Sequence, residues 1–194
     1  MKTAQDLLAF AASYLGESET SGDNSSPRID EIEKYFGMHG QQYCSMFVEY
    51  CLFTTFPGLK GILPKMPSSQ TFWSWGVNQG FTSTDTSHMK PGDIVIWQHE
   101  QTWTGHVGLV ASPVHGDMGF DTIEGNTSPT DKGSQSNGGG IYRKKRYANS
   151  AAFKNDSFHL RGYISLDKLL TLAQSIPSPA QTAPSSKDIN TNKG

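Results

Sequence analysis

The chain has 194 residues, of which 35% are hydrophobic and 18% are charged, and its formal net charge is −2. This length suits one domain with a buried core, and the charge balance argues against nucleic acid or an anionic membrane surface as an obligatory partner. No apolar stretch approaches the roughly 20 residues that a membrane-spanning helix needs, so stable membrane insertion is not expected.

The N-terminal segment, residues 1–16, is predicted to be an amphipathic helix that stops at Gly16. A cleaved signal peptide is the alternative, because Lys2 precedes the apolar letters LLAFAAS. Gln5 and Asp6 interrupt that apolar region at its start, which favours a helix of the mature protein. We therefore expect a protein that is made in the cytoplasm without an export signal of its own.

A second helix is predicted to end at Gly37. Ser25 or Ser26 precedes it as the N-cap, and Pro27 fits its first turn. The most apolar segment, residues 44–55, is predicted to be the third helix.

The sequence pattern changes from helical to strand-like after a fourth helix, which is predicted over residues 68–80 and stops at Gly76 or Gly80. Short β-branched runs follow, each bounded by turn-forming residues. The runs are residues 94–98, 105–112, 119–125, 138–147 and 159–166. Helices followed by an antiparallel sheet indicate an α+β fold, and a last short helix is expected over residues 166–173.

The composition changes again at Ser175. Residues 175–194 are dominated by Pro, Ser, Thr and Asn and offer almost nothing to bury. One folded domain is therefore expected over residues 1–174, followed by a disordered tail over residues 175–194.

Two cysteines, Cys44 and Cys51, lie seven residues apart on the predicted third helix. The helical rise between them, about 10.5 Å, exceeds the roughly 7 Å limit on the Cα separation of a disulfide, so both thiols should be free. Cys44 stands in the first turn, where the helix dipole and free N–H groups favour a thiolate and stabilise an oxyanion. The alternative for Cys44 is a small buried side chain, which is the expected role of Cys51.

A thiolate nucleophile needs a base that also protonates the leaving amine, and histidine does both near neutral pH. Of six histidines, His106 stands out because it opens the run GHVGLV, at the mouth of a predicted strand. In the following run IEGN, Glu124 and Asn126 are spaced i, i+2 and should share one face of a strand. One of them is expected to accept the second ring N–H of His106, although a polar strand end is the alternative.

In this order, YCSMFVEYCL, KPGDIVIWQ, TGHVGLVAS, TIEGN and RGYISL resemble the CHAP family of cysteine- and histidine-dependent amidohydrolases and peptidases. The resemblance covers roughly residues 5–165. It implies a papain-like fold in which N-terminal helices pack on a small antiparallel half-barrel. The site residues that it implies are Cys44 as nucleophile, His106 as general base and acid, Glu124 as the orienting carboxylate and Asn126 as a further polar member.

The resemblance also implies an oxyanion site, formed by the backbone N–H of Cys44 with a loop group such as Gln42 or Tyr43. In the resembling subgroup the two residues before the nucleophile often include Pro-Trp. Here they are Gln42 and Tyr43, so the cleft wall is expected to differ. The tryptophans expected to line the substrate cleft are Trp73, Trp97 and Trp103. No cofactor is implied, and no metal is expected, because HGQQYC lacks the acidic residues of a calcium loop and the upstream carboxylates lack EF-hand spacing.

The function that the resemblance implies is hydrolysis of an amide bond in bacterial peptidoglycan by a monomer that acts in the periplasm or cell wall. Two settings fit a protein without an export signal. One is a phage endolysin released through a holin, and the other is a type VI-secreted antibacterial effector with an immunity protein. Amidase and endopeptidase activity need the same triad, so both stay open.

Two other classes of function compete with this interpretation. A zinc amidase would use His99, Glu100 and His106, but HEQTWTGH is not HExxH and leaves Cys44 unexplained. A non-catalytic glycan-binding module would use the tryptophans, which are more often core or cleft wall. The basic run 143–146 favours a solvated strand over a nucleic-acid site.

Overall fold

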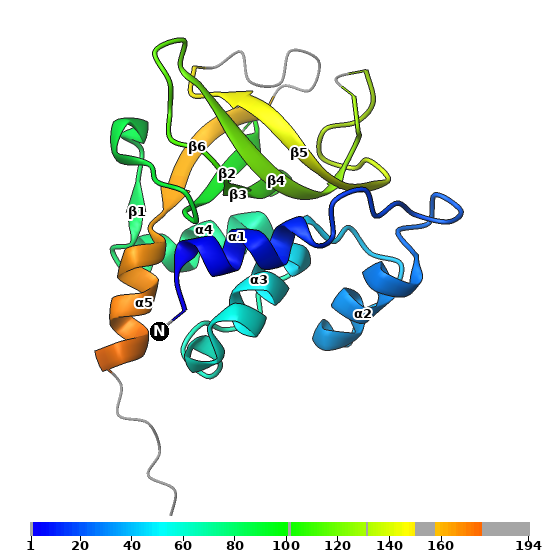
Figure 1. Ribbon diagram of the computed structural model, residues 1–194, viewed down its shortest axis with the longest axis horizontal. Coiled ribbons are helices and arrows are strands. Elements are labelled where there is room, and N and C mark those ends of the chain that lie inside the picture. Colours follow the sequence, from blue (N-terminus) through cyan, green and yellow to red (C-terminus); the bar gives the residue numbers. More distant parts are fainter. Residues whose placement is uncertain (1, 101, 131, 150–157, 176–194) are drawn as a thin grey trace, which may run out of the picture.

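The structure is a computed structural model that describes residues 2–100, 102–130, 132–149 and 158–175. Figure 1 shows two layers, with a curved sheet above and helices below. This arrangement confirms the predicted α+β fold of N-terminal helices packed on a small antiparallel sheet. Within the described ranges, no helix has the length and apolar character needed to cross a membrane. Apart from Ser175, which ends the last helix, the predicted tail lies outside the described residues.

The ends of the first two helices follow from their capping residues. Thr3 caps α1 through a reciprocal capping box with Asp6, and Ser26 caps α2 through the backbone N–H of Ile29. Gly37 ends α2 with a left-handed φ of 73°, as predicted. Helix α1 stops before the predicted Gly16, whose N–H instead donates to Ile141 on the sheet. The two helices are α1 (Ala4–Ala12) and α2 (Pro27–Phe36).

Helix α3 (Cys44–Thr55) is the centre of the helical layer, because it packs against α1, α2 and two sheet strands. Almost every residue of α3 is buried, which explains why its sequence is apolar on all sides. Helix α4 (Ser69–Asn78) continues through Gly76 and ends just before Gly80, the second of the two predicted stops. A Cβ at Gly76 would lie 3.0 Å from Ile164, so this glycine serves close packing on the sheet.

The sheet has the strand order β1-β6-β2-β3-β4-β5, and all its neighbours pair antiparallel. The five predicted strands are present, and the two-residue strand β1 was not predicted. Buried Asp93 accepts the backbone N–H of Leu166, which fixes the start of the last helix against the turn before β2. The elements are β1 (Thr82–Ser83), β2 (Ile94–His99), β3 (Gly105–Val110), β4 (Gly119–Thr127), β5 (Gly140–Tyr147), β6 (Phe158–Ile164) and α5 (Leu166–Ser175).

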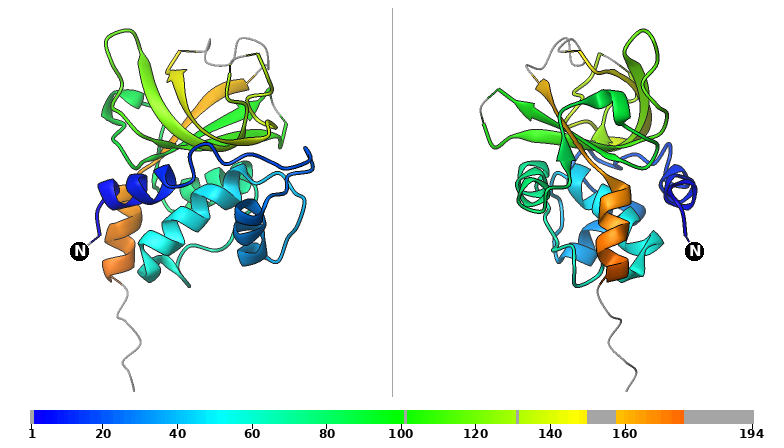
Figure 2. Two further views of the ribbon diagram at one scale, coloured as in Figure 1. Left: turned by 45° about the vertical axis from the view of Figure 1, so that its right-hand side comes forward. Right: turned by 90° about the vertical axis from the view of Figure 1, so that its left-hand side faces the viewer.

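Each face of the sheet carries a separate hydrophobic core. On β2, Ile94 and Ile96 pack toward the helices, whereas Val95 and Trp97 pack with Phe120 on the other face. Figure 2 shows the sheet curving around this second face, away from the helical layer. Polar side chains that start on the second face can therefore be enclosed by the sheet itself.

A buried carboxylate lies at the centre of the helical layer. Glu49 on α3 is fully buried and accepts the backbone N–H of Met66 at 2.9 Å and the Ser45 hydroxyl at 3.2 Å. Burial raises the pKa of Glu49 to about 8, although both hydrogen bonds oppose that shift. Because this pKa is higher in the folded chain than in the unfolded chain, the stability that Glu49 contributes is complete below pH 4.5 and is lost as the pH rises through about 8.

The substitution Glu49→Gln is expected to remove this pH dependence, because the amide is neutral at every pH. Thermal unfolding followed between pH 5 and pH 9 should show a midpoint difference, variant minus wild type, that grows with pH by roughly 8–16 °C if the whole shift is realised. The exposed Asp23→Asn serves as the control. A difference for Glu49→Gln that stays constant over this range would contradict the assignment.

Candidate active site

Cys44 is the first residue of α3, and the helix has no side-chain cap at this end. The N–H groups of the first turn therefore have no side-chain acceptor from the capping residue and are oriented toward incoming negative charge. Cys44 is 7% exposed and lines a pocket of about 200 Å³. The thiol is thus fixed by a buried helix and remains open to a small cleft.

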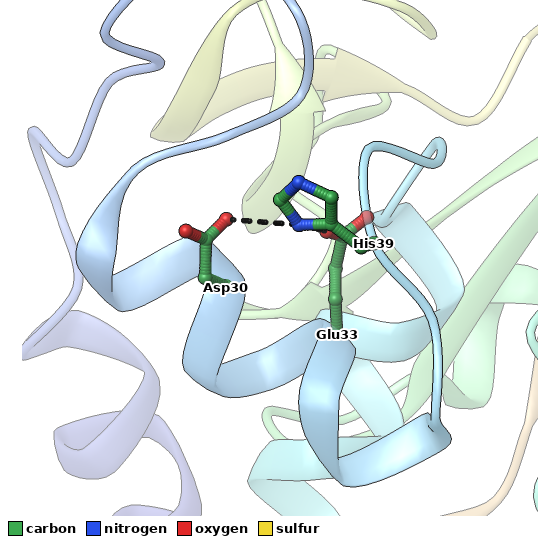
Figure 3. A group of neighbouring side chains, drawn as sticks. All are labelled: Asp30, Glu33 and His39. Atoms are coloured by element: carbon green, nitrogen blue, oxygen red, sulfur yellow. Dashed lines mark ion pairs between the residues drawn. The ribbon is translucent and has the colours of Figure 1, made fainter.

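The loop before Cys44 is held by a carboxylate on α2. Fully buried Glu33 accepts the backbone N–H of Gly40 at 2.7 Å and of Gln41 at 2.6 Å. The His39 Nδ1 atom lies 3.7 Å from Asp30 and 3.8 Å from Glu33. Figure 3 shows these three side chains gathered beside α2. The potential ligand atoms of these three acidic and imidazole groups lie within 4.8 Å of one another. Because both Glu33 oxygens already accept backbone N–H groups, the cluster is explained by its role in shaping the loop, and the expected absence of a required metal stays a prediction.

His106 at the start of β3 is fully buried and connects Cys44 to Glu124. Its Nε2 atom lies 2.9 Å from a Glu124 oxygen, and the Cys44 thiol is near enough to its ring to raise the pKa of His106. An ionised carboxylate only accepts, so Nε2 carries the proton and Nδ1 is the nitrogen available to the thiol. Burial lowers the pKa of His106, but the hydrogen bonds and charges of Cys44 and Glu124 outweigh it and raise this pKa to about 9.

Glu124 on β4 is a fully buried carboxylate with three donors. It accepts the His106 ring N–H, the Thr122 hydroxyl at 2.5 Å and a two-pronged contact from Arg146, whose Nε lies 2.8 Å from Oε1. Burial alone would raise the pKa of Glu124, but the charge and hydrogen bonds of Arg146 and His106 hold it well below its usual range. A Cβ at Gly108 on the neighbouring strand would lie 2.7 Å from the Glu124 Cγ, so the small residue at this position makes room for the carboxylate.

Asn126 does not follow the strand alternation that its sequence spacing suggested. The β4–β5 register shifts between Glu124 and Thr127, and Asn126 has a left-handed φ of 57°. Its side-chain amide donates to the Ser136 carbonyl and to Asn137, both at 3.4 Å, and thereby contacts the loop after β4. The expectation that Glu124 and Asn126 share one face of a regular strand was therefore wrong, because a bulge separates them.

The pocket beside Cys44 contains some of the predicted cleft residues and not others. Gln42 and Trp103 line it, and Trp103 is 75% exposed at the β2–β3 turn. Tyr43, Trp73 and Trp97 do not line this pocket, because their side chains are buried in the two hydrophobic cores. Strand and helix periodicity directs the Trp73 and Trp97 rings inward, and their place in a substrate cleft stays a prediction. The remaining pocket residues are Pro67, Ser68, Ser69, Thr104 and Gly105.

The basic run on β5 contains Arg146, which contacts Glu124 and was not predicted from the sequence as a residue near the site. Arg143 and Lys145 are exposed and pair with Asp121 and Asp117, as a solvated strand predicts. Lys144 and Arg146 point to the other face and are buried. The alternation of a half-buried strand was the available signal, because residues i and i+2 of such a run must share its buried face.

Comparisons with known proteins agree with this geometry. The CHAP domain family model matches residues 34–126, which include Cys44, His106 and Glu124. A solved structure described as "Crystal structure of a wild type endolysin LysIME-EF1" is similar with a TM-score of 0.52 at 15% sequence identity. The alignment covers 85% of this chain and 64% of that chain, and at this identity it shows a shared fold. A comparison with curated proteins finds no match. The CHAP domain family model thus matches the segment that holds these three residues, and the similar structure shows a shared fold.

Proposed function

We propose that the protein is a thiol hydrolase that cleaves an amide bond of bacterial peptidoglycan. The observation that carries this proposal is the placement of the Cys44 thiol near the His106 ring, whose Nε2 lies 2.9 Å from the Glu124 carboxylate. The thiol lines a pocket and the other two side chains are fully buried, which is the arrangement of an activated nucleophile with an oriented base. Peptidoglycan is the substrate implied by the CHAP family.

The proposed reaction begins with attack of the Cys44 thiolate on the carbonyl carbon. A sulfur–carbon bond forms, and the oxyanion that develops is stabilised by N–H groups at the start of α3, with Gln42 as the nearby side chain of the pocket. The His106 Nδ1–H then protonates the leaving amine as the carbon–nitrogen bond breaks. This step leaves a thioester on Cys44 and a neutral imidazole.

Water completes the cycle. Neutral His106 removes a proton from the attacking water, the sulfur–carbon bond breaks and a carboxylate product leaves. The thiolate and imidazolium are thereby restored. Glu124 holds the same ring tautomer throughout, because its ionised oxygen accepts from Nε2.

The similarity to an endolysin favours a lytic enzyme that reaches the wall after release from the cell, as a monomer with residues 1–174 as its catalytic domain. A secreted effector with an immunity protein is the second setting, and amidase and endopeptidase activity are both compatible with the site. A zinc amidase is disfavoured, because His106 is fully buried against Glu124 and the thiol. A pure binding module would not require these three side chains to meet.

Replacement of Cys44 by alanine is expected to abolish hydrolysis. Purified peptidoglycan digested by the wild type should release new peptide or glycan products in mass spectrometry, and their masses should identify the bond. Cys44→Ala should lower the rate by at least about 10³-fold, because the attacking atom is gone. Cys51→Ala is the matched control on the same helix, since Cys51 is fully buried and burial raises the pKa of its thiol. Wild-type products that persist in Cys44→Ala would refute the mechanism.

The pH profile of hydrolysis is expected to fall on its alkaline side near pH 9. The pKa of His106, raised to about 9, is the pH at which the imidazolium loses the proton that the leaving amine needs. The ratio kcat/KM on soluble muropeptides should therefore decline above this pH while circular dichroism shows the chain still folded. A rate that keeps rising beyond pH 10 would instead indicate a neutral histidine that activates a neutral thiol.

A further inference from the structure

We propose that Arg146 is a positioning residue of the active site, which holds Glu124 ionised and oriented so that Glu124 can fix the His106 ring. Nothing in the family match includes this residue, since the matched region ends at residue 126. The inference rests on the catalytic set proposed above, in which Cys44, His106 and Glu124 act together.

Arg146 holds the Glu124 carboxylate through two hydrogen bonds and is itself held by a third. Its guanidinium donates through Nε to one Glu124 oxygen at 2.8 Å and through Nη2 to the other. Its third arm, Nη1, donates to the Gln135 side chain at 3.1 Å, and its head lies 5.8 Å from the centre of the Trp97 ring. This two-pronged geometry fixes the carboxylate in one plane, which a single lysine ammonium would not do.

Burial shows that the contact is costly to maintain. Arg146 is 2% exposed and Glu124 is fully buried. Removing a guanidinium from water costs several kcal/mol, and a carboxylate costs as much, so such a pair is a weak device for stability alone. Arg143 and Lys145 on the other face of the same strand remain in solvent, and buried Lys144 donates to the Ser128 carbonyl, so among the basic residues of this strand the ion pair with Glu124 belongs to Arg146. We therefore explain the Arg146–Glu124 contact by the proposed role of Glu124, which is to orient the His106 ring.

The charge of His106 beside Glu124 changes during the proposed reaction, whereas the positive charge of Arg146 does not. Besides Arg146, the titratable groups around the carboxylate include His106 on β3 and Cys44 on α3, with Tyr142 directly opposite on β5 and buried Lys144 on the same face of β5. In the thioester state the imidazole is neutral and the thiolate is gone. Arginine stays protonated in proteins, so it keeps Glu124 an acceptor at that stage and keeps the His106 tautomer unchanged.

The test measures the reactivity of Cys44 without any wall substrate. Second-order rates of iodoacetamide alkylation, followed by intact mass between pH 3 and pH 9, report the thiolate paired with the imidazolium. In Arg146→Met, Glu124 takes up a proton at higher pH and the thiolate loses a positive charge nearby. Both effects move the acid limb of the profile in the same direction, upward by at least about one pH unit. The matched control Arg143→Met removes the same charge from an exposed position of the same strand and should leave the limb unchanged.

Arg146→Lys separates charge from geometry. This variant should keep the acid limb close to that of the wild type, while hydrolysis of peptidoglycan falls by about tenfold because the two-pronged contact is lost. If Arg146→Met does not fold, the rate of peptidoglycan hydrolysis by Arg146→Lys is compared with that of Arg143→Met. Full activity in Arg146→Lys would overturn the proposal.

A purely structural role would give a different result. It would lower the unfolding temperature of Arg146→Met and reduce alkylation by the same factor at every pH, and an unshifted acid limb would overturn the proposal. Failure of the proposed function is distinguishable, because in that case the wild type would show the alkylation profile and its dependence on Arg146 but would release no product from peptidoglycan.

Discussion

Glu124 carries a negative charge at a place without solvent contact, and the polar groups around it are arranged to stabilise that charge. The carboxylate accepts from His106, Thr122 and Arg146, and each comes from a different position on the enclosed face of the sheet. An unpaired buried carboxylate would take up a proton, and a protonated Glu124 could no longer accept from the histidine ring. The orientation of His106, and with it the reactivity of Cys44, therefore depends on the sheet that aligns β3, β4 and β5.

The helical layer supplies the other half of the site. Helix α3 is buried on all sides between α1, α2 and the sheet, so the position of its first residue is set by the packing of the whole core. Glu33 adds local control, since it binds two backbone N–H groups of the loop that leads to Cys44. The proposed nucleophile and the proposed base therefore lie on two rigid elements, and the packing of those elements holds the pair in place.

Much of the fold follows from local signals in the sequence. Ser26 and Gly37 mark the ends of α2, and the change from helical to alternating periodicity marks the change of layer. Three features were not predicted from the sequence, and each has a physical reason. Strand β1 is two residues long and carries no periodicity, and the bulge at Asn126 depends on its partner strand and the following loop. Arg146 was missed because a run of charges predicts solvent exposure unless the alternation of the strand is applied to it.

The most direct test of the account is the titration of the His106 ring by NMR in wild type and in Cys44→Ala. The account predicts that the wild-type ring titrates near pH 9, because the thiolate and Glu124 together favour the imidazolium over the penalty of burial. Loss of the thiolate in Cys44→Ala should lower this pKa clearly while the contact with Glu124 remains. Identical titration in both proteins would mean that the ring does not sense the thiol, and the proposed catalytic pair would be contradicted.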